Sequence, residues 1–250
     1  MTNNNIYFIA NWKMYGNLNS LNSVKKVIKL SKKKKFKNTK IIYCPPYTLL
    51  NDFSKLTRKT KISIGAQNCH EAEYSGPFTG SVSPHMIASL GVKYIIIGHS
   101  ENRSIGESNS SINKKIISSF KQKLKVIFCI GETLSEKRKN KTNIVFTKQI
   151  SEGLKNIKKL DNIIFAYEPV WCIGTGVIPK ISDLKNNLIR IQKIIKNKFN
   201  SKNPTILYGG SVNSKNVVKL NKISEIRGFL IGSASQNTNK FIDIIKKSII

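Results

Sequence analysis

The sequence has few cysteines and no long apolar run. The four cysteines lie far apart and form neither a Cys-x-x-Cys pair nor a cluster with histidine; they are Cys44, Cys69, Cys129 and Cys172. Neither a zinc module nor a disulfide scaffold is therefore expected. No run of about 18 apolar residues occurs, so a membrane-spanning helix is not expected either.

The amino end lacks the features of a secretory signal. No basic residue precedes its short apolar stretch, and Trp12-Lys13 interrupts that stretch where a signal peptide would continue. Together with the scattered cysteines, this absence predicts a reducing, cytoplasmic location.

Acidic residues are scarce, since 13 Asp and Glu stand against 43 Lys and Arg and give a formal net charge of +30. Such an excess attracts anions and is typical of nucleic-acid-binding proteins. The lysines are spread along the whole chain, however, and only residues 32–35 look like a patch. A binding arm would be a block, and no aromatic-rich RNA-binding strand or GXXG loop is present. The sequence therefore favours a compositional background over a nucleic-acid partner.

Short β-rich apolar runs alternate regularly with segments of helical spacing. We expect eight strands, near residues 6–11, 40–44, 62–67, 94–98, 126–130, 163–168, 205–209 and 228–231. The apolar positions that predict helices between them are Leu18, Leu21, Val24 and Ile28; Ile112, Ile116, Ile117 and Phe120; Leu184, Leu188, Ile191 and Ile195; and Phe241, Ile244 and Ile245.

Each expected strand is a nearly continuous hydrophobic run, which is typical of parallel strands that are buried on both faces. Eight units in 250 residues average about 31 residues each, close to the roughly 30 residues of one βα unit. No linker or composition break divides the chain. We therefore predict the α/β class, with residues 1–250 forming one eight-stranded parallel (β/α)8 barrel; an open doubly wound sheet is the competing fold.

In such a barrel the loops that follow the strands converge on one mouth, where reactive residues gather. The polar residues at or just after the carboxyl ends of the first, third, fourth, fifth and sixth expected strands are Asn11, Lys13, Gln67, Asn68, His99, Glu101, Glu132 and Glu168. The last two strands are followed by the turns Gly209-Gly210-Ser211 and Gly232-Ser233. Glycine turns before helices bind phosphate through free N–H groups and the helix dipole, although ordinary turn glycines explain either motif equally well when it is taken alone.

Glu168 precedes the apolar stretch Pro169-Val170-Trp171, which we expect to raise its pKa toward that of a general base. His99 is a candidate acid or electrophile, and Lys13 a candidate for stabilising an oxyanion. Each has an ordinary alternative: a salt-bridged glutamate, a core histidine, or one lysine among many. Their expected convergence with a phosphate site indicates proton transfer next to a carbonyl in a small phosphorylated substrate, with no metal or other cofactor.

Eight segments carry these residues along the whole chain: NWKMYG at 11–16, GAQN at 65–68, GPFTG at 76–80, IIIGHSENR at 95–103, CIGET at 129–133, AYEPVWCIGTG at 166–176, YGGSVN at 208–213 and GFLIGSAS at 228–235. In order and spacing they resemble the triosephosphate isomerase family. The combination of AYEPVWCIGTG with GHSE is the most specific part of the resemblance.

The resemblance implies interconversion of dihydroxyacetone phosphate and glyceraldehyde 3-phosphate through an enediolate, in glycolysis and gluconeogenesis. It makes Glu168 the base and His99 the electrophile, which in this family is a neutral histidine. Lys13 becomes the ammonium that offsets negative charge, Asn11 its hydrogen-bonding neighbour, and Glu101 the carboxylate that orients the site.

The resemblance also assigns the substrate's phosphate group to residues in three loops, Gly174, Ser211, Gly232 and Ser233. Residues 169–179 correspond to a lid that closes over the substrate and excludes water. Two features of this chain depart from the family: Ser233 adds a side chain where the family has a second glycine, and Pro179 fixes φ at the trailing end of the lid.

A homodimer is implied as well. In the family, a loop corresponding to residues 73–83 enters a pocket beside the other subunit's active site, with Thr79 near the partner's Asn11 and the partner's Glu101. Ser81 and Asn102 stand where the family usually has a Glu and an Arg that pair across the interface. Replacing both charged residues destabilises the interface less than replacing one of them, because no buried charge is left unpaired.

Overall fold

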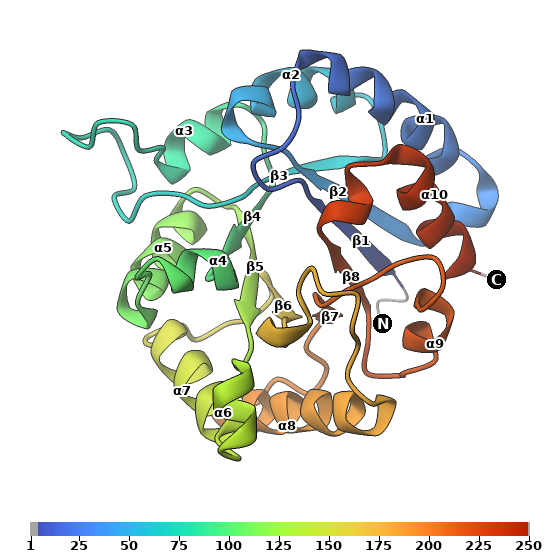
Figure 1. Ribbon diagram of the computed structural model, residues 1–250. Coiled ribbons are helices and arrows are strands. Elements are labelled where there is room, and N and C mark those ends of the chain that lie inside the picture. The colour runs from blue at the N-terminus through green and yellow to red at the C-terminus, as the bar shows by residue number, and fades with distance from the viewer. Residues whose placement is uncertain (1–4, 250) are drawn as a thin grey trace.

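The computed structural model describes residues 5–249. Eight parallel strands form a closed barrel in which each pairs with the next and β8 pairs with β1 (Figure 1). The strands are β1 (Ile6–Asn11), β2 (Thr39–Cys44), β3 (Ser63–Ala66), β4 (Tyr94–Ile97), β5 (Lys125–Ile130), β6 (Ile163–Tyr167), β7 (Ile206–Tyr208) and β8 (Gly228–Ile231). The predicted barrel is confirmed, and the open sheet that competed with it is wrong.

Helices surround the barrel, as the view along its axis shows (Figure 1). They are α1 (Leu21–Ser31), α2 (Tyr47–Thr57), α3 (Pro84–Ser89), α4 (Ser100–Ser104), α5 (Asn109–Lys121), α6 (Leu134–Arg138), α7 (Thr142–Gly153), α8 (Ile181–Phe199), α9 (Val217–Asn221) and α10 (Thr238–Lys247). Four 3-10 turns lie in the loops: η1 (Leu18–Ser20), η2 (Lys34–Phe36), η3 (Val170–Cys172) and η4 (Ser233–Ser235). Within residues 5–249, no helix is long and apolar enough to cross a membrane.

The helix phases predicted for α5, α8 and α10 agree with the buried faces, and in α1 Val24, Leu21 and Ile28 also face the core, so only Leu18 departs from the prediction. Leu18 is 64% exposed and lies in η1, ahead of the helix. A reciprocal contact between Asn17 and Ser20 holds that turn, so the helix begins three residues later than the apolar spacing suggests. The face that α1 buries is formed by Val24, Val27 and Leu30.

The strands are buried on both faces because the core has two layers. In β1, Phe8 and Ala10 belong to the layer between barrel and helices, whereas Tyr7 and Ile9 belong to the layer inside the barrel. This double burial explains why the strands read as continuous apolar runs instead of alternating ones.

Closure of the barrel depends on Gly228, the first residue of β8, which pairs with Tyr7 of β1. Its φ is +144°, and a Cβ at this position would lie 2.1 Å from the carbonyl oxygen of Tyr7. The first and last strands therefore approach closely only because residue 228 has no side chain.

We expect Gly228→Ala to lower the free energy of unfolding by more than about 3 kcal/mol, because a backbone clash adds to the cost of a positive φ. Gly106→Ala is the matched control: its φ is +105°, and nothing lies within 4 Å of its added Cβ. That control should cost about 1–2 kcal/mol. Urea unfolding measures both variants, and equal losses would contradict this account of closure.

Candidate active site

The carboxyl-terminal ends of the strands surround a cavity of 740 Å³. All nine residues that the sequence assigns to catalysis or substrate binding line it: Asn11, Lys13, His99, Glu101, Glu168, Gly174, Ser211, Gly232 and Ser233. The structure thus brings together residues from the carboxyl-terminal ends of five strands and the loops that follow them, as expected for the mouth of a barrel.

Lys13 is held in an unusual backbone conformation, with φ at 56°. Its N–H donates to Asn11 Oδ1 (3.1 Å), and its carbonyl oxygen accepts from Gln67 Nε2 (2.9 Å). The ammonium contacts Glu101 Oε1 at 2.5 Å. Left-handed backbone at a non-glycine residue persists only where its surroundings impose it, and such residues cluster at functional sites.

His99 caps the first turn of α4, and its Nδ1 accepts the N–H of Glu101 at 3.2 Å. A ring nitrogen that accepts a hydrogen bond carries no proton, so the ring is the neutral tautomer with its proton on Nε2. That Nε2 lies 3.3 Å from Glu168 Oε1, and both side chains are almost fully buried. The ring therefore presents one N–H group to the centre of the cavity.

Glu168 follows β6 and lies where two glycines leave space for it. A Cβ on Gly131 would lie 1.8 Å from the Glu168 carbonyl oxygen, and a Cβ on Gly209 would lie 2.7 Å from Glu168 Cγ. The Ser100 N–H also points to the carboxylate, at 3.4 Å from Oε2. Backbone and side chain are thus both fixed, which a group that transfers protons between defined atoms requires.

The glycine turns after β7 and β8 expose backbone donors at the cavity. Within the described chain, the N–H groups of Gly210, Ser211 and Ser233 donate to no protein acceptor. Gly232 lies next to Lys13, since a Cβ at residue 232 would lie 3.4 Å from Lys13 Cε. Free N–H groups close to an ammonium form an anion site.

The lid, residues 169–179, is tied to the turn after β7. The Ser211 hydroxyl donates to the Cys172 carbonyl oxygen (2.6 Å) and accepts the N–H of Gly176 (3.1 Å). Gly174 and Gly176 both have positive φ with open space around them. The lid therefore lies over the cavity in a conformation that these glycines allow.

Glu132 anchors the leading end of the lid, a role that sequence reasoning missed although it placed this residue at a strand end. Its fully buried carboxylate accepts hydrogen bonds from Tyr167 Oη and Trp171 Nε1, both at 3.2 Å. Lys137 Nζ lies over the Trp171 ring, 3.8 Å from its centre. Burial raises the pKa of the Glu132 carboxyl, and the hydrogen bonds oppose that rise only in part.

Six further polar residues line the cavity and were not predicted: Tyr15, Asn213, Ser214, Lys215, Gln236 and Lys240. Two of them are lysines, which no sequence pattern distinguishes from the other lysines of this chain. Gln67 was noted at a strand end, but its role in holding the Lys13 backbone depends on a contact 54 residues apart in the chain.

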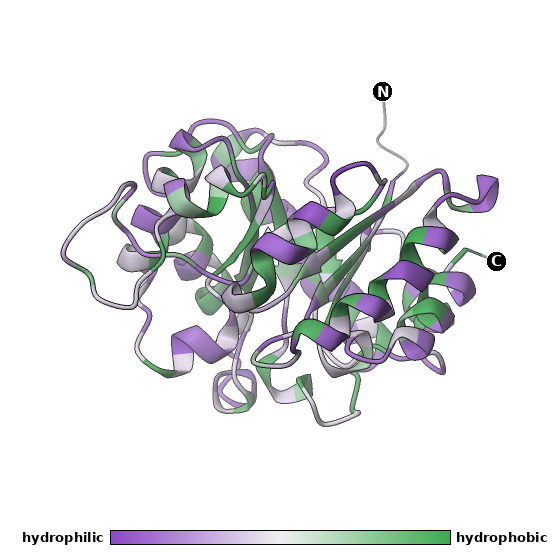
Figure 2. Cartoon of the chain, turned by 90° about the horizontal axis from the view of Figure 1, so that it is seen from above, coloured by the Kyte–Doolittle hydropathy of each residue, from purple (hydrophilic) through white to green (hydrophobic). Residues whose placement is uncertain are grey.

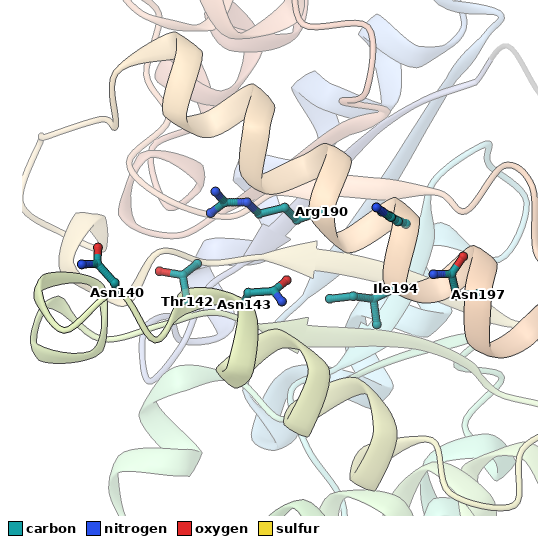
Figure 3. Close-up of a pocket in the computed structure, with 7 residues that line it drawn as sticks. Asn140, Thr142, Asn143, Arg190, Ile194 and Asn197 are labelled. Carbon is teal, nitrogen blue, oxygen red and sulfur yellow. The ribbon is translucent and has the colours of Figure 1, made fainter.

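A second cavity, of 550 Å³, lies on the outer surface between α7 and α8 (Figure 3). It holds none of the predicted site residues. Its lining consists of Asn140, Thr142, Asn143, Arg190, Lys193, Ile194 and Asn197. In the part of the chain that the structure describes, no group of three His, Cys, Asp or Glu residues is placed to hold a metal ion.

Comparison with known proteins gives one result throughout. A family model described as triosephosphate isomerase matches residues 6–248. The triosephosphate isomerase of Dictyoglomus thermophilum is 43% identical over 244 residues, covering 95% of this chain and 97% of the relative. That of Dictyostelium discoideum is 36% identical over 255 residues, covering 100% and 98%. The crystal structure of triosephosphate isomerase from Bartonella henselae aligns with a TM-score of 0.87 at 32% identity, covering 97% of this chain and 98% of that one.

The raised pKa of Glu132 gives a prediction for stability. A carboxyl whose pKa is higher in the folded than in the unfolded protein binds its proton more tightly when folded, so its contribution to stability falls as pH rises above the usual value of 4.5. Glu132→Gln removes this titration. Relative to the variant, the wild-type protein should therefore lose free energy of unfolding between about pH 4 and neutral pH. Urea unfolding across that range measures the difference, and a difference that is constant or opposite in sign would contradict the assignment.

Proposed function

Because the chain belongs to the triosephosphate isomerase family and interconverts dihydroxyacetone phosphate and glyceraldehyde 3-phosphate, we propose that Glu168 is the base of this reaction and His99 its electrophile. The observation that carries this proposal is the 3.3 Å contact between Glu168 Oε1 and His99 Nε2 in the cavity that also contains the glycine turns. A base and a proton donor at this distance can act on two adjacent carbon and oxygen centres of one small substrate.

The reaction moves one proton between C1 and C2 of the substrate, the two carbons that do not carry the phosphate. Glu168 takes the proton from the hydroxyl-bearing carbon, and an enediolate forms as the electrons move onto the carbonyl oxygen. Return of the proton to the neighbouring carbon completes the aldose-ketose isomerisation. Glu168 is only 2% exposed, so its carboxylate is kept out of bulk water. The electrostatic interaction between the carboxylate and the bound substrate is stronger as a result.

His99 donates its Nε2 proton to the oxygen on which negative charge develops. The neutral tautomer suits this step, because a hydrogen bond from Nε2–H stabilises the enediolate and the same nitrogen can then move a proton between its two oxygens. The amide of Glu101, bonded to Nδ1, fixes that tautomer.

Lys13 supplies a positive charge between the reacting atoms and the phosphate. Asn11 and Glu101 hold its backbone and its ammonium. We assign the phosphate to the free amides of Ser211 and Ser233 with Gly232, and to Gly174 of the lid. No metal or other cofactor enters this chemistry, since side chains supply base, proton donor and cation.

We further propose that the whole chain acts as one catalytic domain in the cytoplasm. Glycolysis and gluconeogenesis use both of its substrates there. All four cysteines are free thiols in the structure, as expected of a protein in a reducing compartment.

We also propose a homodimer. The loop between β3 and α3 projects from the barrel, drawn in cyan in Figure 1. Large exposed apolar side chains lie on this loop and near it, on the loops after β1 and β4 and on α3; they are Met14, Tyr15, Leu18, Tyr74, Phe78, Met86 and Ile105. Clustered exposed apolar side chains mark an interaction surface.

The catalytic assignments are tested with a coupled assay of glyceraldehyde 3-phosphate isomerisation on the purified protein. Glu168→Asp withdraws the carboxylate by one methylene and should lower kcat by at least about 100-fold with little change in KM. His99→Gln should lower kcat by roughly 10²–10⁴-fold. Glu136→Asp, at the cap of α6 outside the cavity, is the control and should keep the wild-type rate. Wild-type kcat in Glu168→Asp or His99→Gln would refute its role.

The homodimer is tested by sedimentation across protein and salt concentrations. We expect a dimer at micromolar protein that rising salt leaves intact or tightens. Salt screens repulsion between two subunits of charge +30, and Ser81 and Asn102 leave no ion pair to weaken at this contact. An active monomer, or a dimer that dissociates as salt rises, would contradict the proposal.

A further inference from the structure

The excess of positive charge is concentrated at the end of the barrel opposite the cavity. This amino-end face consists of the segments that join each helix to the next strand, with the first two residues of that strand and the turn η2. It carries eighteen exposed basic side chains: Lys32, Lys33, Lys34, Lys35, Lys37, Lys40, Arg58, Lys59, Lys61, Lys93, Lys123, Lys125, Lys155, Lys158, Lys159, Lys202, Lys222 and Arg227. Its acidic residues are Asp161 and Glu225.

The loops at the cavity end are nearly neutral by comparison. Counting the short helices α4 and α6 with their loops, they carry eight basic residues against seven acidic ones. The basic residues are Lys13, Arg103, Lys137, Arg138, Lys139, Lys141, Lys180 and Lys215; the acidic ones are Glu71, Glu73, Glu101, Glu107, Glu132, Glu136 and Glu168. The excess charge of the amino-end face is therefore not part of the substrate site at the mouth.

The basic side chains of the amino-end face have no acidic partners within residues 5–249. All six ion pairs in this part of the chain use carboxylates of the cavity-end loops, among them Glu71, Glu73 and Glu107. Like charges crowded on one face repel one another and destabilise the fold. A polyanion that bound there would neutralise them and release its own condensed counterions.

Sequence spacing conceals this face. The lysines are scattered along the chain, and this scatter favours the interpretation that the positive charge is a compositional background. The barrel, however, returns the chain to the same end after every βα unit, so scattered residues such as Lys33, Lys93 and Lys158 come to lie at one end of the molecule. Figure 2 shows the molecule turned by 90° from the view of Figure 1, with purple, hydrophilic segments on many of its loops.

We propose that the amino-end face binds the phosphate backbone of a nucleic-acid duplex without reading its sequence. Its charges extend over the connections to seven of the eight strands, which suits an extended polyanion better than a small one. None of the large exposed apolar side chains of residues 5–249 lies on this face. It therefore offers neither the apolar anchors that favour a membrane surface nor aromatic rings for stacking unpaired bases.

Binding to the face leaves the cavity open, so the two activities are independent. The test is the fluorescence anisotropy of a labelled 20-base-pair duplex titrated with the full-length protein at about 0.05–0.3 M salt, where phosphate contacts give a steep salt dependence. In the face variant, Lys33, Lys59, Lys123, Lys158 and Lys202 are each replaced by Gln. The matched control replaces the exposed helix residues Lys26, Lys148, Lys185, Lys193 and Lys219 by Gln and loses the same net charge.

We expect the face variant to bind the duplex at least about tenfold more weakly, with the slope of log K against log salt reduced by up to about 4.5, or 0.9 per lost contact. The control should change affinity less than threefold, and both variants should isomerise triose phosphates at the wild-type rate. Equal weakening in the two variants would overturn the proposal, because a diffuse field would explain it. No binding of the wild-type protein at about 0.15 M salt and 100 µM, weaker than typical non-specific binding, would also overturn it. So would binding to vesicles containing phosphatidylserine without binding to the duplex.

Discussion

Closure of eight parallel strands into one barrel is the constraint on which the rest of the molecule depends. Because all strands point the same way, every loop that follows a strand lies at one end and every loop that precedes a strand lies at the other. Gly228 permits this closure by letting β8 approach Tyr7 of β1. Without it, Lys13 after β1 and Gly232 after β8 would not be neighbours. The Lys13 ammonium would then lie away from the glycine turn to which we assign the phosphate.

The chemistry of the cavity depends on side chains that are each held in one conformation. The backbone amide of Glu101 fixes the tautomer of His99, and the absence of a Cβ at residues 131 and 209 fixes the position of Glu168. Lys13 is held in left-handed backbone by its contacts with Asn11 and Gln67. Preorganised groups of this kind need not rearrange when charge develops on the substrate, which is the main source of electrostatic catalysis.

The sequence predicts the strands and the gathering of site residues well, because both depend on short-range patterns. A continuous apolar run followed by a polar residue is enough to place Glu168 at the mouth. Such a local pattern does not reveal that Glu132 accepts a hydrogen bond from Trp171, or that Gln67 donates one to the Lys13 backbone, because these contacts join distant loops. The start of α1 was misplaced for a local reason, since the Asn17 and Ser20 contact competes with the apolar spacing. The distribution of charge between the two ends is also a property of the fold and not of the spacing of lysines.

Transfer of a proton between two carbons of the substrate by a carboxylate leaves an isotopic signature that can be measured. The purified protein converts dihydroxyacetone phosphate in D2O while the glyceraldehyde 3-phosphate is removed by a coupling enzyme, and the product is analysed by NMR. A proton held by Glu168 exchanges with solvent, so we expect deuterium at C2 of the product. Product without deuterium at C2 would indicate that hydrogen passes directly from carbon to carbon, and would contradict the role of Glu168 as the base.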